Sequence, residues 1–149
     1  MRRAERAQAL IWLTVALPLF VSMAGLAVDG AILLATRRQL QSVADGAARA
    51  GATRVDLARL RASGGADLQL DRPSAAATAQ AYLDEQLPRE LGWDVAPTAQ
   101  IDVAPRRVHV VVQGALHTAF LRIVHVDRVP VDATAFADLQ IGIRDSTGS

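Results

Sequence analysis

Three histidines, His109, His117 and His125, suggest a metal site, but their spacing does not support one. They form no tight ligand motif, and the chain contains no HExxH pattern and no cysteine that would supply thiolate ligands. We therefore predict no metal and no cofactor, with the histidines facing solvent or the edge of a sheet.

The carboxylates near these histidines give no better case for catalysis. They occupy alternating or turn positions, where carboxylates normally face water, and a Ser–His–Asp arrangement does not follow from order along the chain. The final segment, residues 145–149 (DSTGS), echoes the DxSxS start of an adhesion-type metal site without the rest of that motif, so we interpret it as a flexible polar terminus. We predict a non-enzymatic protein. The carboxylates in question are Asp102, Asp127, Asp132 and Asp138.

Two further carboxylates have unusual settings. Asp29 follows a stretch, residues 7–28, that carries no charge. A carboxylate at membrane depth suggests a function, although Asp29 at the edge of a span could also reach interfacial water or cap the next helical segment before Gly30.

Asp45 interrupts a run of small residues, where a surface pair with Arg49 at i,i+4 would contribute roughly 0.2–0.5 kcal/mol. A solvated helix face is the simpler interpretation of Asp45, and an intersubunit contact is the alternative.

The composition limits the class of protein further. The chain of 149 residues has room for one domain and an anchor. Its 16 basic residues, all arginine, nearly balance 15 acidic ones, which argues against a nucleic-acid-binding surface. Without cysteine, a domain outside the cytoplasm must be held together by packing or by its partners. We expect neither nucleic acid nor a small-molecule substrate as a ligand.

Residues 9–28 (ALIWLTVALPLFVSMAGLAV) predict a membrane-spanning helix. About 20 apolar residues make roughly 30 Å of helix, the thickness of the hydrocarbon core. Trp12 suits the headgroup zone, and Pro18 should kink the helix or free one carbonyl. The basic excess before the span predicts that residues 1–8 are cytoplasmic, in a single-pass membrane protein. That excess comes from Arg2, Arg3 and Arg6.

A cleaved secretory signal is the alternative interpretation of the same segment. Gly25-Leu26-Ala27 would serve as a small-x-small cleavage site after a basic start and an apolar stretch. The protein would then be a secreted, soluble binding domain. The apolar run is longer than that of a usual signal and continues without a break into a helical pattern, which favours a retained anchor.

Beyond the span, residues 29–61 predict a helical extension. Leu33, Leu40 and Ala47 recur every seven residues, and Val43, Ala50 and Leu57 do so in the complementary register. Much of this apolar seam is alanine or Gly51, so we expect partner helices to approach it closely. Gly30 would permit a bend, and the helix should end near Leu60, before Ser63-Gly64-Gly65.

Residues 62–149 predict a small extracytoplasmic domain. A second helix should begin near Pro73, with Asp71 or Arg72 as its cap. Alternation predicts strands over residues 98–103, 108–113 and 131–139, with a turn at 105–107 and a short helix over 116–124. The fold class is α+β, a long N-terminal helix packed on a small antiparallel sheet.

Three segments carry a family resemblance: residues 5–10 (ERAQAL), 24–29 (AGLAVD) and 37–52 (RRQLQSVADGAARAGA). In this order, over roughly the first 53 residues, they resemble the TadE/TadG-like proteins of Tad (Flp) pilus assembly systems. A looser likeness to pseudopilin-like subunits, a strand, a short helix and a strand, covers residues 108–139. The chain is too short for the von Willebrand A-type domain of some larger TadG proteins.

The resemblance implies a pilin-like subunit that is anchored in the bacterial cytoplasmic membrane and helps to assemble a pilus. Its partners would be other pilin-like subunits, membrane components of the assembly machine and membrane lipid. Glu5 would correspond to the glutamate that pilin-like helices pair with a neighbour's N-terminal amine, or would simply offset Arg2 or Arg6. Flp-type prepilins are cut after a glycine before the apolar helix, whereas the first glycine here is Gly25. The positions that we expect to pack or to set register are Glu5, Pro18, Gly25, Asp29, Leu40, Asp45 and Gly51.

Overall fold

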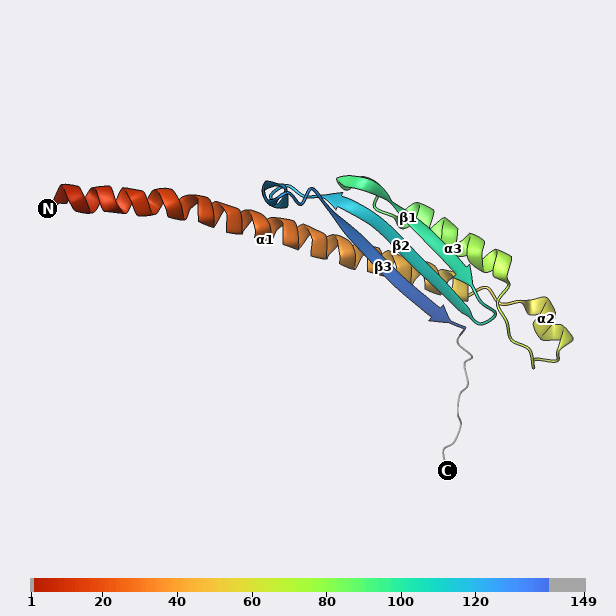
Figure 1. Ribbon diagram of the computed structural model, residues 1–149. Helices are drawn as coiled ribbons and strands as arrows, with labels where there is room; N and C mark the ends of the chain where they lie inside the picture. The colour runs from red at the N-terminus through yellow and green to blue at the C-terminus, as the bar shows by residue number, and fades with distance from the viewer. Residues whose placement is uncertain (1, 140–149) are drawn as a thin grey trace, which may run out of the picture.

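One continuous helix forms the long axis of the molecule (Figure 1). The computed structural model describes residues 2–139, without the side chains of residues 2–11, 123 and 124. The helix α1 (Arg2–Ala52) has 51 residues, which corresponds to roughly 75 Å at a rise of about 1.5 Å per residue. Its N-terminal half, up to about residue 28, projects beyond the folded domain, and we call this part the arm. Its C-terminal half lies against the folded domain.

The domain is built on a three-stranded antiparallel sheet with the order β1-β2-β3. Its strands are β1 (Trp93–Val103), β2 (Arg107–His117) and β3 (Arg128–Asp138). Alternate residues are buried because successive side chains of a strand point to opposite faces. Val108, Val110 and Val112 are fully buried on β2, as the predicted alternation requires. The three predicted strands and the α+β class are thus confirmed, although each strand is longer than its prediction.

The helices cover one face of this sheet. Helix α3 (Arg72–Gln86) begins as predicted, since Asp71 is its N-cap and accepts hydrogen bonds from the backbone N–H and the hydroxyl of Ser74, at 3.4 and 2.6 Å. Leu83 of α3 and Leu40 of α1 are fully buried, and they meet the valines of β2 in one hydrophobic core. The opposite face of the sheet carries exposed residues such as Thr134 and Phe136.

Small residues let α1 and α3 approach closely. A Cβ atom placed on Gly51 would lie 3.0 Å from the carbonyl oxygen of Ala75 and 3.3 Å from Val108. The alanines at this contact have no exposed surface at all. The apolar seam of α1 therefore packs inside its own chain, against α3 and the sheet. The alanines concerned are Ala44, Ala47, Ala48, Ala75 and Ala79.

Helix α1 ends at Ala52, whereas the prediction placed its end near Leu60. Val55 forms a β-bridge with Leu70, and the backbone of Asp56 bonds to that of Gln69 at 2.9 Å. This pairing needs an extended chain. A new short helix, α2 (Leu57–Ala62), then starts with Asp56 as its N-cap. Leu57 is 54% exposed and so does not belong to the seam.

The short helix predicted for residues 116–124 is also wrong in its bounds. Residue Leu116 pairs with Val129 in the sheet and is buried, so β2 continues to His117. Only the 3-10 turn η1 (Leu121–Val124) is helical. Within α1, the helix continues unbroken through Pro18 and Gly30, so the backbone shows no interruption at either residue.

We predict that Leu83→Ala destabilises the domain by about 2–5 kcal/mol, because the change leaves a cavity between α3 and the sheet. The measurement is thermal and urea unfolding of the full chain in detergent micelles, followed by circular dichroism. Leu57→Ala, at an exposed leucine, is the matched control and should change stability by less than about 0.5 kcal/mol. Equal effects of the two substitutions would contradict this description of the core.

Candidate functional site

The most distinctive polar contact lies where the arm of α1 meets the domain. Asp29 is only 3% exposed, and its carboxylate accepts hydrogen bonds from three consecutive backbone N–H groups. These belong to Ala119, Phe120 and Leu121, at 3.2, 2.8 and 2.7 Å. A buried carboxylate requires such partners, and a run of N–H groups at the start of a helical turn is well suited to supply them. The contact joins segments about 90 positions apart in the sequence.

Gly25 completes this contact one helical turn before Asp29. Residues at i and i+4 lie on the same face of a helix, so Gly25 and Asp29 meet the same loop. The ring of Phe120 lies directly over Gly25, and any Cβ atom there would overlap it. We call Gly25, Asp29 and residues 119–121 the clasp. The clasp fixes the η1 region to α1 by one ring contact and three hydrogen bonds.

The loop that reaches the clasp, residues 118–127 (the η1 loop), is closed by its own backbone contacts. The Thr118 hydroxyl donates to the Val126 carbonyl, and the Thr118 N–H donates to the Asp127 carbonyl at 3.2 Å. His125 adopts a left-handed conformation with φ 64° and donates its N–H to Arg122 O at 3.1 Å. Val126 donates its N–H to Leu121 O, also at 3.1 Å. Asp29 thus supplies the partners that the loop itself lacks.

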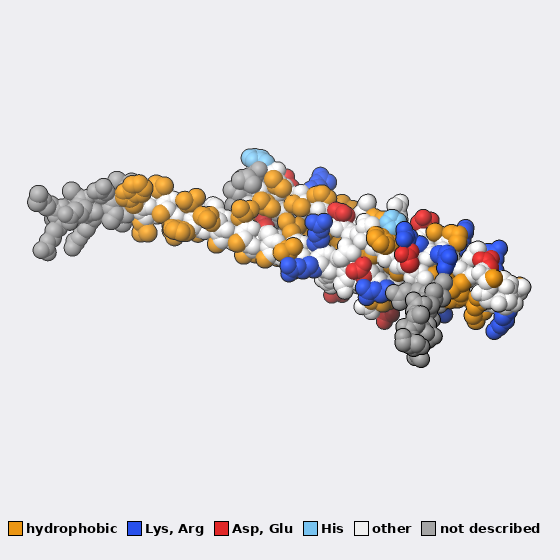
Figure 2. Space-filling model, turned by 90° about the horizontal axis from the view of Figure 1, so that it is seen from below, with side chains coloured by type: hydrophobic (Ala, Val, Ile, Leu, Met, Phe, Trp, Pro, Cys, Tyr) orange, Lys and Arg blue, Asp and Glu red, His pale blue; other side chains and the backbone are white. Residues whose placement is uncertain are grey.

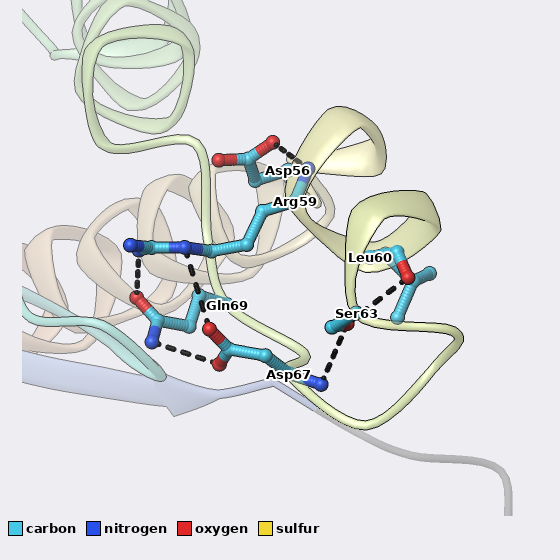
Figure 3. Close-up of polar contacts among 6 residues, drawn as sticks. All are labelled: Asp56, Arg59, Leu60, Ser63, Asp67 and Gln69. Carbon is cyan, nitrogen blue, oxygen red and sulfur yellow. Dashed lines mark hydrogen bonds and ion pairs between the residues drawn. The ribbon is translucent and has the colours of Figure 1, made fainter.

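A second polar cluster lies at α2 (Figure 3), at the end of the molecule opposite the N-terminus (Figure 1). The Arg59 guanidinium donates to Gln69 at 2.8 Å and forms an ion pair with Asp67 at 3.3 Å. Gln69 donates in turn to Asp67 at 2.9 Å. Ser63 accepts from the backbone N–H of Asp67 and donates to the Leu60 carbonyl. These groups satisfy one another, and we assign the cluster to holding the α2 loop.

A third cluster lies on the open face of the sheet. The Arg107 guanidinium donates to both carboxylate oxygens of Asp138, at 2.6 and 3.0 Å, and lies 5.4 Å from the centre of the Phe136 ring. The hydrogen bonds from Arg107 lower the pKa of Asp138 below its ordinary value, and the pKa of Arg107 is raised by the same contact. Both side chains are more than half exposed, so solvent weakens the pair. It joins the ends of β2 and β3.

The histidines are far from forming a common site. His117 Nε2 lies 3.1 Å from Asp94, which also faces Arg128 at 3.7 Å. His109 pairs with Phe136 across the sheet, and His125 lies in the η1 loop. Within residues 2–139, no group of three or more His, Cys, Asp or Glu side chains is arranged to hold a metal ion.

The other positions singled out from the sequence are widely separated. Leu40 and Gly51 lie in the core of the domain, whereas Pro18 is exposed on the arm. Asp45 accepts a hydrogen bond from Gln41 at 3.2 Å, and no ion pair between Asp45 and Arg49 occurs in the part of the chain that the structure describes. Glu5 lies in α1, and its side chain is outside the described residues. Gly25 and Asp29 alone come together.

The sequence did not reveal Phe120 and the N–H groups of residues 119–121 as the partners of Asp29. The two structural interpretations of Asp29, contact with interfacial water and capping of the helix that follows, differ from the observed contact, and a functional role of Asp29 stays a prediction. A signal did exist, because the apolar character of α1 resumes after Asp29, from Ala31 to Ala35. A lone carboxylate within a long apolar surface needs a partner from elsewhere in the fold.

The arm itself is apolar and largely uncovered. Among the described residues, α1 is the one helix that could cross a membrane by length and composition, and 11% of its most apolar window is buried in the structure. Trp12 and Phe20 are each 68% exposed. A core helix of a water-soluble protein would be mostly buried, so this surface requires another cover.

Comparison with known proteins gives one match. Residues 7–54 match the model of a family described as putative Flp pilus-assembly TadE/G-like, which confirms the resemblance seen in the N-terminal residues. The match covers nearly all of α1 and ends just after it, and the looser likeness over residues 108–139 lies outside it. No curated protein and no solved structure shows significant similarity to the chain.

We predict that Asp29→Leu releases the η1 loop from α1, because three N–H groups lose their charged acceptor at once. Hydrogen exchange of the full chain in micelles, read by mass spectrometry, should then speed up on the order of tenfold over residues 118–127. Asp84→Leu, which removes an exposed partner of Arg89, is the control and should leave the loop unchanged. Unaltered protection in Asp29→Leu would show that Asp29 does not hold the loop.

Proposed function

We propose that this chain is a non-enzymatic, single-pass membrane subunit, similar to a minor pilin, that takes part in assembling a Tad (Flp) pilus. The observation that carries the proposal is the family match over residues 7–54, which coincides with a helix that is apolar and largely exposed over residues 12–28. A surface of this kind is stable in a bilayer and not in water. The polar clusters of the domain are engaged in structural pairs, which supports a role in assembly over catalysis.

The arrangement of charges supports an orientation. Arg2, Arg3 and Arg6 precede the apolar segment, and a basic excess favours the cytoplasmic side of a membrane. The domain of α3 and the sheet would then lie outside the cytoplasm. Packing and the hydrogen bonds described above hold this domain together, since the chain has no cysteine.

The clasp argues for a retained anchor over a cleaved signal. Cleavage after Ala27 would remove Gly25, which lies beneath the ring of Phe120. It would also leave Asp29 close to a new, flexible N-terminus. A signal peptide is normally dispensable to the mature fold, whereas Gly25 contributes to the contact between α1 and the domain.

The structure changes which residues we assign to contacts with partners. Substitutions at Leu40 or Gly51 would disturb the core of the domain and would therefore test folding and not assembly. We propose that subunit contacts are made by the exposed arm, where Pro18 lies, and by Glu5 near its start. Asp45 lines a groove with Phe136 and Leu139 and is the third candidate.

We expect the native protein to retain its N-terminus in the membrane fraction, because the arm is the anchor. Intact-mass spectrometry should give the full-length mass, with or without Met1. Loss of only the first few residues would indicate peptidase trimming and would favour Glu5 as the partner of an amine. A mass that begins near Val28 would refute the anchor and support the secreted binding domain.

Because the chain lacks cysteine, single cysteines test the orientation cleanly. Gln100→Cys on the exposed sheet should react with a membrane-impermeant maleimide in intact spheroplasts, and Ala4→Cys only after permeabilisation.

Deletion of the gene should abolish surface pili, and the wild-type chain should restore them. Normal piliation of the deletion strain would contradict the role in pilus assembly.

A further inference from the structure

The exposed apolar surface of α1 extends beyond the predicted end of the span at Val28. Ile32 and Leu34 are 49% and 50% exposed, and the first exposed charges after the arm are Arg37 and Arg38. Asp29 does not interrupt this surface, because its carboxylate is turned into the clasp and is 3% exposed. Figure 2 shows hydrophobic side chains along the arm as far as the base of the domain, where the first arginines appear.

The clasp lies within this apolar stretch and not at its end. From Trp12 to Ala35 the helix is roughly 36 Å long, whereas the hydrocarbon core is about 30 Å thick. Gly25 and Asp29 lie about 9–15 Å before the end of the stretch, at about 1.5 Å per residue. A loop bound to them must therefore lie at the level of the outer leaflet or its interface. A tilt of α1 within the usual range would bring the loop deeper into the membrane, because a tilted helix fits more of its apolar stretch into the same thickness.

The η1 loop, residues 118–127, has a surface that fits this position. Phe120 and Val126 are 36% and 39% exposed although they belong to the folded domain. Exposed Arg122 lies between them in sequence, and an arginine can place its stem along apolar surface and its guanidinium among headgroups. Asp127 and Arg128 follow at the end of the loop, both exposed.

The backbone of the loop is also suited to a medium of low polarity. Unpaired N–H and C=O groups are costly in lipid, and irregular backbone is tolerated there only when it is paired. The N–H groups of residues 118–121, 125 and 126 all have acceptors, three of them from Asp29. A groove beside this part of α1 is lined mainly by apolar residues, among them Leu33, Leu34, Val129 and Pro130, together with Arg37 and Asp132.

We propose that the η1 loop is a second membrane contact of this chain, inserted into the interface of the outer-facing leaflet beside α1. The occupant of this surface is the lipid bilayer, because the loop is continuous with the surface of the spanning helix. The proposal rests on the membrane anchor proposed above. Phe120 and Val126 enter the boundary between headgroups and acyl chains, and Asp29 keeps the loop at that depth.

The test uses the full chain reconstituted into phosphatidylethanolamine–phosphatidylglycerol vesicles, with one environment-sensitive fluorophore on a single cysteine. The label is placed at Val126→Cys in the loop, at Leu17→Cys in the arm or at Phe136→Cys on the open sheet. Lipids with a nitroxide near the headgroup quench labels in the membrane interface, lipids with a nitroxide on the acyl chain quench labels in the hydrocarbon core, and aqueous iodide quenches labels in water. We expect a blue shift and lipid quenching at position 126, lipid quenching at 17, and iodide quenching at 136.

The outcomes separate this proposal from the one on which it rests. If the label at 17 is quenched by lipid while that at 126 is quenched only by iodide, the loop faces water and the second contact is refuted with the anchor intact. If the label at 17 is not quenched by lipid, the anchor fails and this proposal with it. In a further test, adding Asp29→Leu to the Val126→Cys protein should decrease lipid quenching at 126; an unchanged signal would refute the role of the clasp in holding the loop at depth.

Discussion

The carboxylate of Asp29 lies where α1 changes from an exposed apolar arm to a helix of the domain core, and a charge at that position needs partners of its own. The chain supplies them from a loop about 90 positions away, as three consecutive backbone N–H groups. Gly25 makes room for Phe120 on the same face. The position of η1 relative to α1, and the continuity of the apolar surface up to Ala35, both depend on this pairing.

The C-terminal part of α1 lies in the core of the domain, although its helical geometry is the same as that of the exposed part. Beyond Thr36 its inward face consists mainly of Leu40 and of alanines, and these pack on α3, β2 and β3. Alanines bury little surface each, but they allow helix backbones to lie close together. Gly51 shows how close: a Cβ atom placed there would lie 3.0 Å from the carbonyl oxygen of Ala75. Most of the hydrophobic stabilisation must then come from the larger fully buried side chains, such as Leu83 and Val110.

Much of this fold followed from local pattern. The alternation in β2 and β3 predicted both strands, and Asp71 before Arg72-Pro73 predicted the start of α3, because caps and strand faces are set by neighbours in sequence. The end of α1 was not predictable in this way, since Val55 is extended by its bridge to Leu70. The heptad pattern predicted that one face of α1 is buried, but periodicity does not identify which element packs against that face. The partner of Asp29 was invisible for the same reason: its donors are backbone groups, which carry no residue-specific signal.

The clasp also determines how the arm and the domain move relative to each other. Gly30 would have been the natural hinge between them, yet α1 runs through it as regular helix. The domain holds α1 on both sides of Gly30: the η1 loop contacts Gly25 and Asp29 before it, and the core packs on Leu33 and Leu40 after it. Bending at Gly30 would have to break the contacts of Asp29 while the core remains packed. A helix held in this manner transmits its tilt to the domain. In the proposed membrane topology, the orientation of α1 would therefore set the orientation of the sheet.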